Sequence, residues 1–132
     1  MKTDNFHFNQ VVLVSGPVII KDGKVLLNKH GESQLWKFPG GDITASAGDL
    51  ESWAVKKAKE ELGIDIKIIK ALKPMIIWKE DETIILFHYL AELLTDNIKP
   101  ADYVREWAWL DINKLPQDCS ENVKKIIQEI VD

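Results

Sequence analysis

The sequence has few cysteines and no long apolar segment, and each of these absences excludes a class of protein. The chain has 132 residues and one cysteine, Cys119, so no disulfide can form within it and a reducing compartment is expected. No histidine lies near Cys119, which favours a partly buried thiol over a nucleophile. The longest apolar run, at residues 11–14, is far too short to cross a bilayer, and residues 1–10 hold no apolar signal core. We therefore expect a cytoplasmic protein.

Positive charge is also in short supply. Lysine and arginine total 17 against 21 aspartate and glutamate residues, for a net charge of -4. This balance argues against a large nucleic-acid surface, although a small basic pocket for one nucleotide is compatible with it. The apolar fraction of 45% is that of a globular protein, and no repeat or linker divides the chain. We expect a single domain over residues 1–132, with a core that needs no disulfide.

Strand signals flank a tight turn near the N-terminus. Residues 11–20 are rich in β-branched side chains and predict a strand, which we expect to be interrupted near Gly16 and Pro17. The Asp-Gly pair in residues 21–24 predicts a hairpin turn, and residues 25–30 predict the returning strand. Four further strands are predicted at residues 64–69, 75–79, 83–93 and 106–112.

Two helices complete the pattern. The first is expected to begin at an Asp49 N-cap and to end at Gly63, with its buried stripe on Leu50, Ala54, Ala58 and Leu62. For the second, Asp118 is the expected cap, with Glu121 three residues later in the capping-box position. Its buried stripe is expected on Val123, Ile126, Ile127 and Ile130. The order β-β-α-β-β-β-β-α predicts an α+β fold or a mixed-sheet sandwich.

The first helix also carries side chains suited to chemistry. At helical spacing, Lys57, Glu60 and Glu61 fall within one arc, separate from the apolar stripe. The glycine-rich loop at residues 39–41 precedes this helix. Two carboxylates facing a loop carbonyl are typical ligands of Mg²⁺ or Mn²⁺. The alternative is an ordinary solvated helix face with a weak ion pair between Lys57 and Glu61.

The segment at residues 41–64 resembles the Nudix box. The family pattern is Gly, five residues, Glu, seven residues, Arg-Glu, an aliphatic, any, Glu-Glu, any, Gly, an aliphatic. "KKAKEELGI" matches its end, with Glu60, Glu61, Gly63 and Ile64 in register. "LWKFPGG", "GPVIIKDGKVLLNKH" and "EWAWLDINKLP" also resemble family members at the right spacing, so the resemblance covers residues 11–116. It implies a Nudix-like α/β/α sandwich with a mixed β-sheet.

The departures from the box bear on activity. Lys56 takes the place of the arginine, and Lys57 that of the first glutamate in the terminal cluster. The earlier glutamate place falls on Gly48, with Asp49 beside it, and the box is one residue longer than the pattern. Lys57 puts a positive charge where the family has a negative one. We therefore expect one bound cation rather than two or three, and a slow or specialised enzyme.

The resemblance implies Mg²⁺- or Mn²⁺-dependent hydrolysis of a nucleoside diphosphate linked to another group. In this hypothesis Glu60 and Glu61 hold the cation together with the carbonyl group of Gly40. Lys56 orients Glu60, and Lys57 lies beside the same cluster. These four side chains are the candidate catalytic residues.

Substrate contacts are assigned to three residues. Gly41 belongs to the loop, Glu106 resembles a position that often faces the substrate, and Trp36 is the candidate for stacking on a base. Trp107 and Trp109 point to one side of their strand and are expected to cover the core.

The remaining acids and histidines are given ordinary roles. A solvated hairpin tip is the expectation for Glu80, Asp81 and Glu82, although some family members supply a base from such a loop. His7, His30 and His88 show no metal-ligand spacing, so surface or packing roles are favoured.

Two other functions stay open. A Nudix fold could bind a nucleotide or sugar nucleotide without cutting it, and the ammonium of Lys57 against a phosphate would suit that use. A protein-interaction domain with no small ligand is the second. Family members often form a homodimer, but no residue here locates an interface.

Overall fold

A computed structural model describes residues 10–44, 48–95 and 97–131. Its elements are β1 (Gln10–Lys21), β2 (Lys24–His30), β3 (Gly41–Asp42), α1 (Leu50–Leu62), β4 (Ile66–Ala71), β5 (Met75–Trp78), β6 (Glu82–Leu93), β7 (Val104–Asp111) and α2 (Glu121–Val131). The predicted order holds, with the two-residue strand β3 added.

The first strand differs from its prediction. It is not interrupted at Gly16 and Pro17, because β1 pairs with β6 in parallel without a shift from Gln10 to Ile19. The predicted Asp-Gly turn is present, with φ of 54° at Asp22 and 76° at Gly23.

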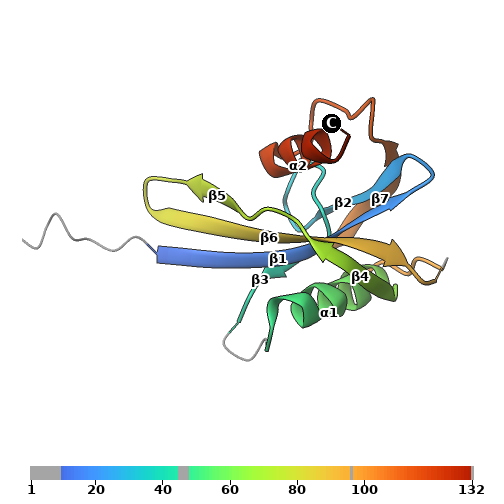
Figure 1. Cartoon of the computed structure of the whole chain (residues 1–132), viewed down its shortest axis with the longest axis horizontal. Helices are drawn as coiled ribbons and strands as arrows, with labels where there is room; N and C mark the ends of the chain where they lie inside the picture. The colour runs from blue at the N-terminus through green and yellow to red at the C-terminus, as the bar shows by residue number, and fades with distance from the viewer. Residues whose placement is uncertain (1–9, 45–47, 96, 132) are drawn as a thin grey trace, which may run out of the picture.

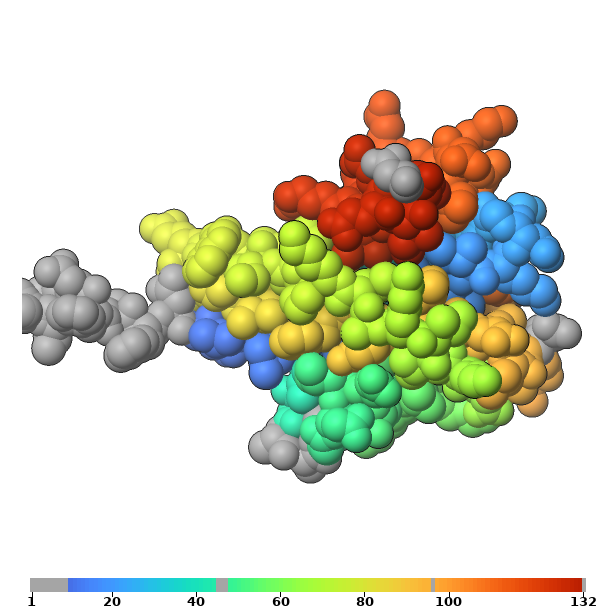
Figure 2. Space-filling model, in the orientation of Figure 1, coloured from blue at the N-terminus to red at the C-terminus, as the bar shows by residue number. Residues whose placement is uncertain are grey.

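The strands form one mixed sheet in the order β4-β6-β1-β2-β7. β1 and β6 are parallel, whereas β2 is antiparallel to both β1 and β7, and β4 and β5 are antiparallel to β6. α1 covers one face of this sheet and α2 the other (Figure 1). The ends of β1, β5 and β6 project beyond both helices (Figure 2). The α+β fold with a mixed sheet is therefore confirmed.

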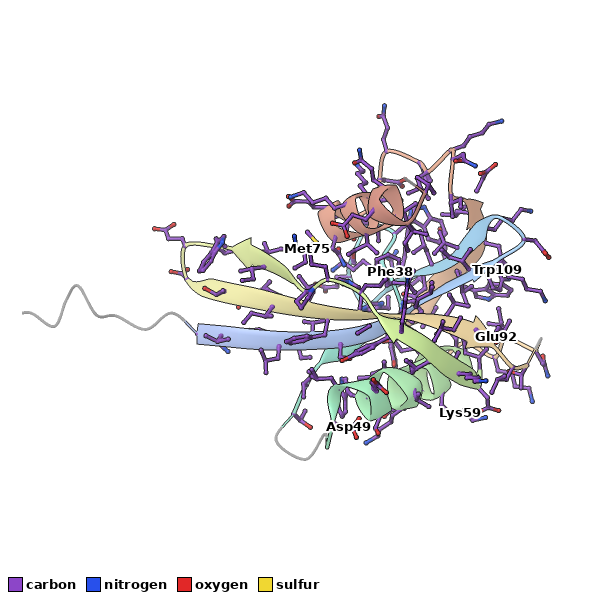
Figure 3. All side chains as sticks on the ribbon, in the orientation of Figure 1. Phe38, Asp49, Lys59, Met75, Glu92 and Trp109 are labelled. Carbon is purple, nitrogen blue, oxygen red and sulfur yellow. The ribbon has the colours of Figure 1, made fainter. Side chains whose placement is uncertain are left out.

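Alternation along the strands builds two apolar layers. Val18 faces the layer under α2 and the next residue, Ile19, faces the layer under α1. The α2 layer consists of Val18, Val25, Leu27, Phe38, Cys119, Val123, Ile126 and Ile127. The α1 layer consists of Ile19, Leu26, Ala58, Leu62, Ile64, Ile66, Ala91 and Val104. Figure 3 shows Phe38 in the middle of the molecule, beneath α2.

The helix ends agree with the sequence at α1 but not at α2. Oδ1 of Asp49 accepts a hydrogen bond from the backbone N–H of Ser52 at 2.7 Å, and Gly63 ends α1 with a φ of 67°. α2 begins at Glu121, directly after Ser120, so the predicted cap at Asp118 is wrong. Asp118 lies outside the helix because its backbone C=O accepts a hydrogen bond from the N–H of Trp36 at 2.8 Å.

Cys119 is buried in the α2 layer, as expected, and burial raises the pKa of its thiol. Within residues 10–44, 48–95 and 97–131, no helix combines the length and apolar character needed to cross a membrane.

Candidate active site

A glycine loop between β2 and α1 is pressed against the middle of β1. A Cβ atom at Gly16 would lie 2.1 Å from the carbonyl oxygen of Pro39, and one at Gly40 would lie 2.7 Å from the carbonyl oxygen of Ser15. Gly40 also has a φ of 140°, which L side chains rarely adopt. The loop can approach the strand this closely only because both positions are glycine.

Hydrogen bonds join α1 to this loop and strand. The indole Nε1–H of Trp53 donates to the carbonyl oxygen of Gly41 at 3.2 Å. The hydroxyl group of Ser15, which is fully buried on β1, donates to the carbonyl oxygen of Leu50 at 2.8 Å. The first turn of the helix therefore has a fixed position relative to the loop.

Glu61 turns inward from α1, and only 2% of it is exposed. The backbone N–H of Gly40 donates to both of its carboxylate oxygens at 3.3 Å, and the amide Nδ2 of Asn28 donates to Oε2 at 3.5 Å. Burial raises the pKa of Glu61 to about 7, although the hydrogen bonds from Gly40 and Asn28 oppose the shift. The carboxyl group is thus poised between its charged and neutral forms at neutral pH.

The other three box residues lie nearer the solvent. The carboxylate of Glu60 is exposed and pairs with the ammonium of Lys57 at 3.8 Å. The ammonium of Lys56, predicted to orient Glu60, instead lies 5.2 Å from the ring centroid of Trp53. Lys57 makes the ion pair with Glu60 at i,i+3 spacing, and its Cε would lie 3.2 Å from a Cβ at Gly41.

His30, at the end of β2, belongs to the same polar network. Its Nδ1 lies 2.7 Å from Oδ1 of Asn28, the buried residue that also contacts Glu61. The ring of Tyr103 meets the imidazole edge-on at 6.3 Å between centroids. The pKa of His30 is lowered, first by burial and then by the charges of Lys37 and Lys57. This imidazole is therefore neutral at pH 7.

A pocket of about 400 Å³ opens beside the glycine loop. Its apolar wall includes Val14, Phe38, Ile77, Ile84 and Leu86, and its polar lining includes His30, Lys37, Gly40, Gly41, Asp42, Lys79, His88, Ser120, Glu121 and Asn122. Apolar walls with a few placed polar groups are typical of small-ligand sites. Two lysines on the lining supply positive charge suited to phosphate.

The far end of the pocket, under α2, holds a second hydrogen-bond chain. The hydroxyl of Ser120 donates to Oδ1 of Asn122 at 2.6 Å, and Nδ2 of Asn122 lies 3.1 Å from Nε2 of His88. Nε2 is therefore the acceptor. Burial lowers the pKa of His88 to about 4, so this ring is also neutral at pH 7.

The predicted substrate contacts separate into those at the pocket and those outside it. Gly41 lines the pocket, whereas Trp36 does not. Trp36 packs against the α2 layer, with Nζ of Lys29 4.8 Å from its ring centroid. Glu106 is exposed on β7, and its carboxylate lies 3.9 Å from the same ammonium.

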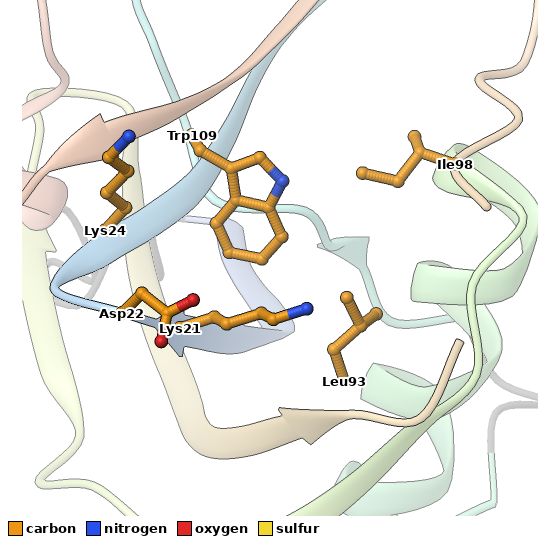
Figure 4. A pocket seen from close by; sticks show the side chains of 6 residues that line it. All are labelled: Lys21, Asp22, Lys24, Leu93, Ile98 and Trp109. Carbon is orange, nitrogen blue, oxygen red and sulfur yellow. The ribbon is translucent and has the colours of Figure 1, made fainter. Parts of the chain in front are cut away.

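Both tryptophans of β7 were expected to cover the core, and only Trp109 does so. Trp109 packs against the α1 layer and lines a second cavity of about 350 Å³ near the β1–β2 turn, together with Lys21 and Lys24 (Figure 4). Trp107 was expected to cover the core and does not, because it is 39% exposed on a strand at the edge of the sheet.

The fit of a divalent cation follows from the donor set. Among the described residues, no group of three or more histidine, cysteine, aspartate or glutamate side chains is arranged to hold a metal ion. Glu60 and Glu61 supply two carboxylates, beside the ammonium of Lys57. This set fits one ion whose coordination is completed by substrate phosphate and water, and it does not fit a cluster.

Several residues of the site escaped the sequence reasoning. Asn28 could have been found, because it is a polar residue in the apolar run of β2, and a buried amide in a strand needs hydrogen-bond partners. His30 and His88 were assigned to surface or packing roles, yet both line the pocket. Lys37 and Asn122 gave no signal, since loop lysines and helix-start asparagines are common. His7 lies outside the described residues.

Comparison with known proteins identifies the family of this chain. The family model of the NUDIX domain matches residues 11–130. The putative 8-oxo-dGTP diphosphatase YtkD of Bacillus subtilis (strain 168) is 30% identical over 102 residues, which are 77% of this chain and 63% of that protein. The chain therefore spans less than two thirds of the length of this relative.

Solved structures agree in fold. The MutT NUDIX hydrolase from Burkholderia pseudomallei has a TM-score of 0.82 at 23% identity, covering 92% of this chain and 98% of its own. A C. elegans Ap4A hydrolase has a TM-score of 0.77 at 17% identity, covering 91% and 95%. Because a matching family model covers most of the sequence, this chain belongs to the Nudix family.

Proposed function

We propose that the chain hydrolyses the pyrophosphate bond of a nucleoside diphosphate linked to another group, with the aid of one Mg²⁺ or Mn²⁺ ion. The observation that carries this proposal is the position of Glu61. Its carboxylate is held against the glycine loop by the N–H of Gly40, beside a pocket large enough for a nucleotide base.

Glu60, Glu61 and the carbonyl group of Gly40 are the ligands that this proposal gives to the ion. A bound divalent ion neutralises phosphate charge and polarises phosphorus toward attack by water. Lys57 provides a second positive charge at the same place, since its side chain lies against Gly41. The phosphates would therefore lie along the loop, between the ion and this ammonium.

The apolar wall of the pocket suits a flat ring. Phe38 and Leu86 line it and are almost fully buried. A base that enters the pocket would exchange its own contact with water for contact with the carbon atoms of this wall. Lys37 and Lys79 lie on the lining, where they would attract the phosphates. The printed name of YtkD makes 8-oxo-dGTP one reasonable substrate to test.

A second function, binding without cleavage, is favoured by the pair between Lys57 and Glu60. That contact at 3.8 Å occupies one of the two carboxylates with a lysine. A protein that used Lys57 to hold phosphate in place of a metal ion would bind nucleotide and release it unchanged.

The deciding experiment incubates the protein with a panel of nucleoside diphosphate derivatives and nucleoside triphosphates, including 8-oxo-dGTP, with Mg²⁺ or Mn²⁺. Products are followed by mass spectrometry. We expect metal-dependent release of a nucleoside monophosphate or of phosphate, and its loss in Glu61→Gln. Turnover that survives in Glu61→Gln would refute the metal assignment. A ligand that raises the melting temperature without turnover would establish the binding function instead.

A further inference from the structure

We propose that His30 is the general base of the hydrolysis, with its Nε2 taking a proton from the water that attacks phosphorus. This inference rests on the proposed function. It starts from the fact that Lys57 occupies the place of a box glutamate, so that the site has lost a carboxylate that could accept a proton.

The tautomer of His30 follows from its partners. Asn28 points its amide Nδ2 toward Oε2 of Glu61, because the opposite orientation would place two acceptors against each other. Oδ1 of Asn28 therefore faces His30 at 2.7 Å, and Nδ1 of His30 must be the donor. In a neutral imidazole this leaves an unshared electron pair on Nε2.

The ring is also held in place. Tyr103 packs edge-on against it, and the backbone N–H of Gly31 donates to the carbonyl oxygen of Tyr103 at 2.9 Å. Nε of Arg105 donates to the carbonyl oxygen of Gly31 at 2.8 Å, which ties the end of β2 to β7. A base whose orientation is fixed by a third group is a recurring arrangement in hydrolases.

The other groups of the site are poorer candidates. Glu61 is buried and already accepts hydrogen bonds from Gly40 and Asn28, and Glu60 is paired with Lys57. Nε2 of His88 accepts from Asn122 and is not free. Asp42 and Glu121 line the same pocket but are exposed to solvent. Among side chains with an ordinary pKa, imidazole titrates nearest to pH 7. The pKa of Glu61 is also about 7, but its carboxylate oxygens already accept hydrogen bonds from Gly40 and Asn28.

The attack of water on phosphorus transfers one proton to His30 and releases the leaving group with an electron pair. One O–H bond of the water breaks and its proton passes to Nε2 of His30, while the water oxygen forms a new bond to phosphorus. The P–O bond to the leaving phosphate group breaks, and its electron pair departs with that group. Oδ1 of Asn28 supports the resulting imidazolium through Nδ1–H. The nearby charges of Lys37 and Lys57 then favour return of the proton to solvent.

The test compares His30→Gln, His30→Ala and the exposed control Glu32→Gln. We expect kcat to fall by about 10²–10⁴-fold in both His30 variants, the usual contribution of a general base, with KM changed less than about threefold. Free imidazole should restore His30→Ala at least about tenfold and leave His30→Gln unchanged, since glutamine fills the space. Glu32→Gln should stay within about twofold of the unmodified protein.

Three outcomes would overturn the proposal. A kcat in folded His30→Gln within about threefold of normal would show that no proton passes to this residue. Loss of activity without imidazole rescue of His30→Ala would assign it a positioning role only. Abolition of activity by Asp42→Asn, with His30→Gln active, would identify Asp42 as the base. An unmodified protein that cleaves no nucleotide would instead refute the proposed function itself.

Discussion

Each end of the pocket lies beside a buried ionisable side chain, and burial shifts the pKa values of these two side chains in opposite directions. At the glycine loop, Glu61 is buried and its pKa is raised to about 7. Under α2, His88 is buried and its pKa is lowered to about 4. In both cases burial disfavours the charged form.

The groups around each side chain explain why only Glu61, at the loop end of the pocket, can change its charge near pH 7. Donated hydrogen bonds from Gly40 and Asn28, and the charge of Lys57, stabilise the carboxylate of Glu61. No group offsets burial in the same way at His88, whose Nδ1 has no hydrogen-bond partner among the described residues. The loop end can therefore change charge near pH 7, whereas the α2 end stays neutral.

The largest effect is expected from a change that breaks the loop end alone. In Gly16→Ala the new methyl group would lie 2.1 Å from the carbonyl oxygen of Pro39, so the loop must move away from β1. We expect a loss of about 3 kcal/mol or more in the free energy of unfolding, measured with urea, together with loss of any nucleotide hydrolysis.

A matched control tests whether the close approach is the cause. Gly23→Asn changes another glycine, in the β1–β2 turn, where a Cβ meets nothing within 4 Å. Asparagine tolerates the left-handed conformation of this residue, so the cost should stay below about 1 kcal/mol. Equal losses in the two variants would contradict the role given to the contact between Gly16 and the loop.

The second prediction concerns the pH dependence of Glu61. Its folded pKa of about 7 exceeds the ordinary value of 4.5, so the folded state binds more protons between these values. The free energy of unfolding should therefore fall, relative to Glu61→Gln, as pH rises from about 4.5 to about 7. The difference should reach about 3 kcal/mol and then remain constant. Urea unfolding of both metal-free proteins between pH 4.5 and 8 measures it, and parallel curves would exclude the shift.

His88 should give the mirror image of this curve. Its folded pKa of about 4 lies below the ordinary value of 6.5, so the unfolded state binds more protons between these values. Relative to His88→Gln, the protein should lose up to about 3 kcal/mol as pH falls from about 6.5 to about 4. The same unfolding series measures this loss. A difference that grows on the alkaline side instead would mean that His88 is charged in the folded protein.

The same contrast separates what the sequence predicts from what it does not. The helix that carries Glu61 was predicted with both its ends, because Asp49 and Gly63 are local signals read within a few residues. The glycine loop was placed beside it for the same reason. The fold class followed from the order of these local signals.

Most features of the pocket near α2 could not be predicted from the sequence. Asp118 was a reasonable cap by spacing alone, but a backbone hydrogen bond from Trp36, distant in sequence, holds it outside the helix. His30 and His88 come to one pocket only through pairing of strands that the sequence does not specify. Polar networks that cross strands depend on register, and register is set by the whole sheet.

The smallest expected effect, and the sharpest test of the loop end, comes from Lys57→Glu. This change returns a carboxylate to the place that the Nudix box gives it, and it removes the ammonium that pairs with Glu60 at 3.8 Å. In the absence of nucleotide, Mn²⁺ should bind about tenfold more tightly, equivalent to about 1.4 kcal/mol, since solvent screens part of the gain. Isothermal titration calorimetry measures this affinity directly.

Lys59→Glu is the matched control, because it makes the same charge change on the exposed face of α1, where Lys59 pairs with Asp65 at 3.3 Å. Its effect should stay below about twofold. If both variants tighten Mn²⁺ binding equally, the overall charge of the protein is responsible, and Lys57 has no special place at the site. If Lys57→Glu binds Mn²⁺ more tightly but loses turnover, the ammonium acts on the substrate itself, and the loop end would then hold phosphate with a lysine where other family members use a metal ion.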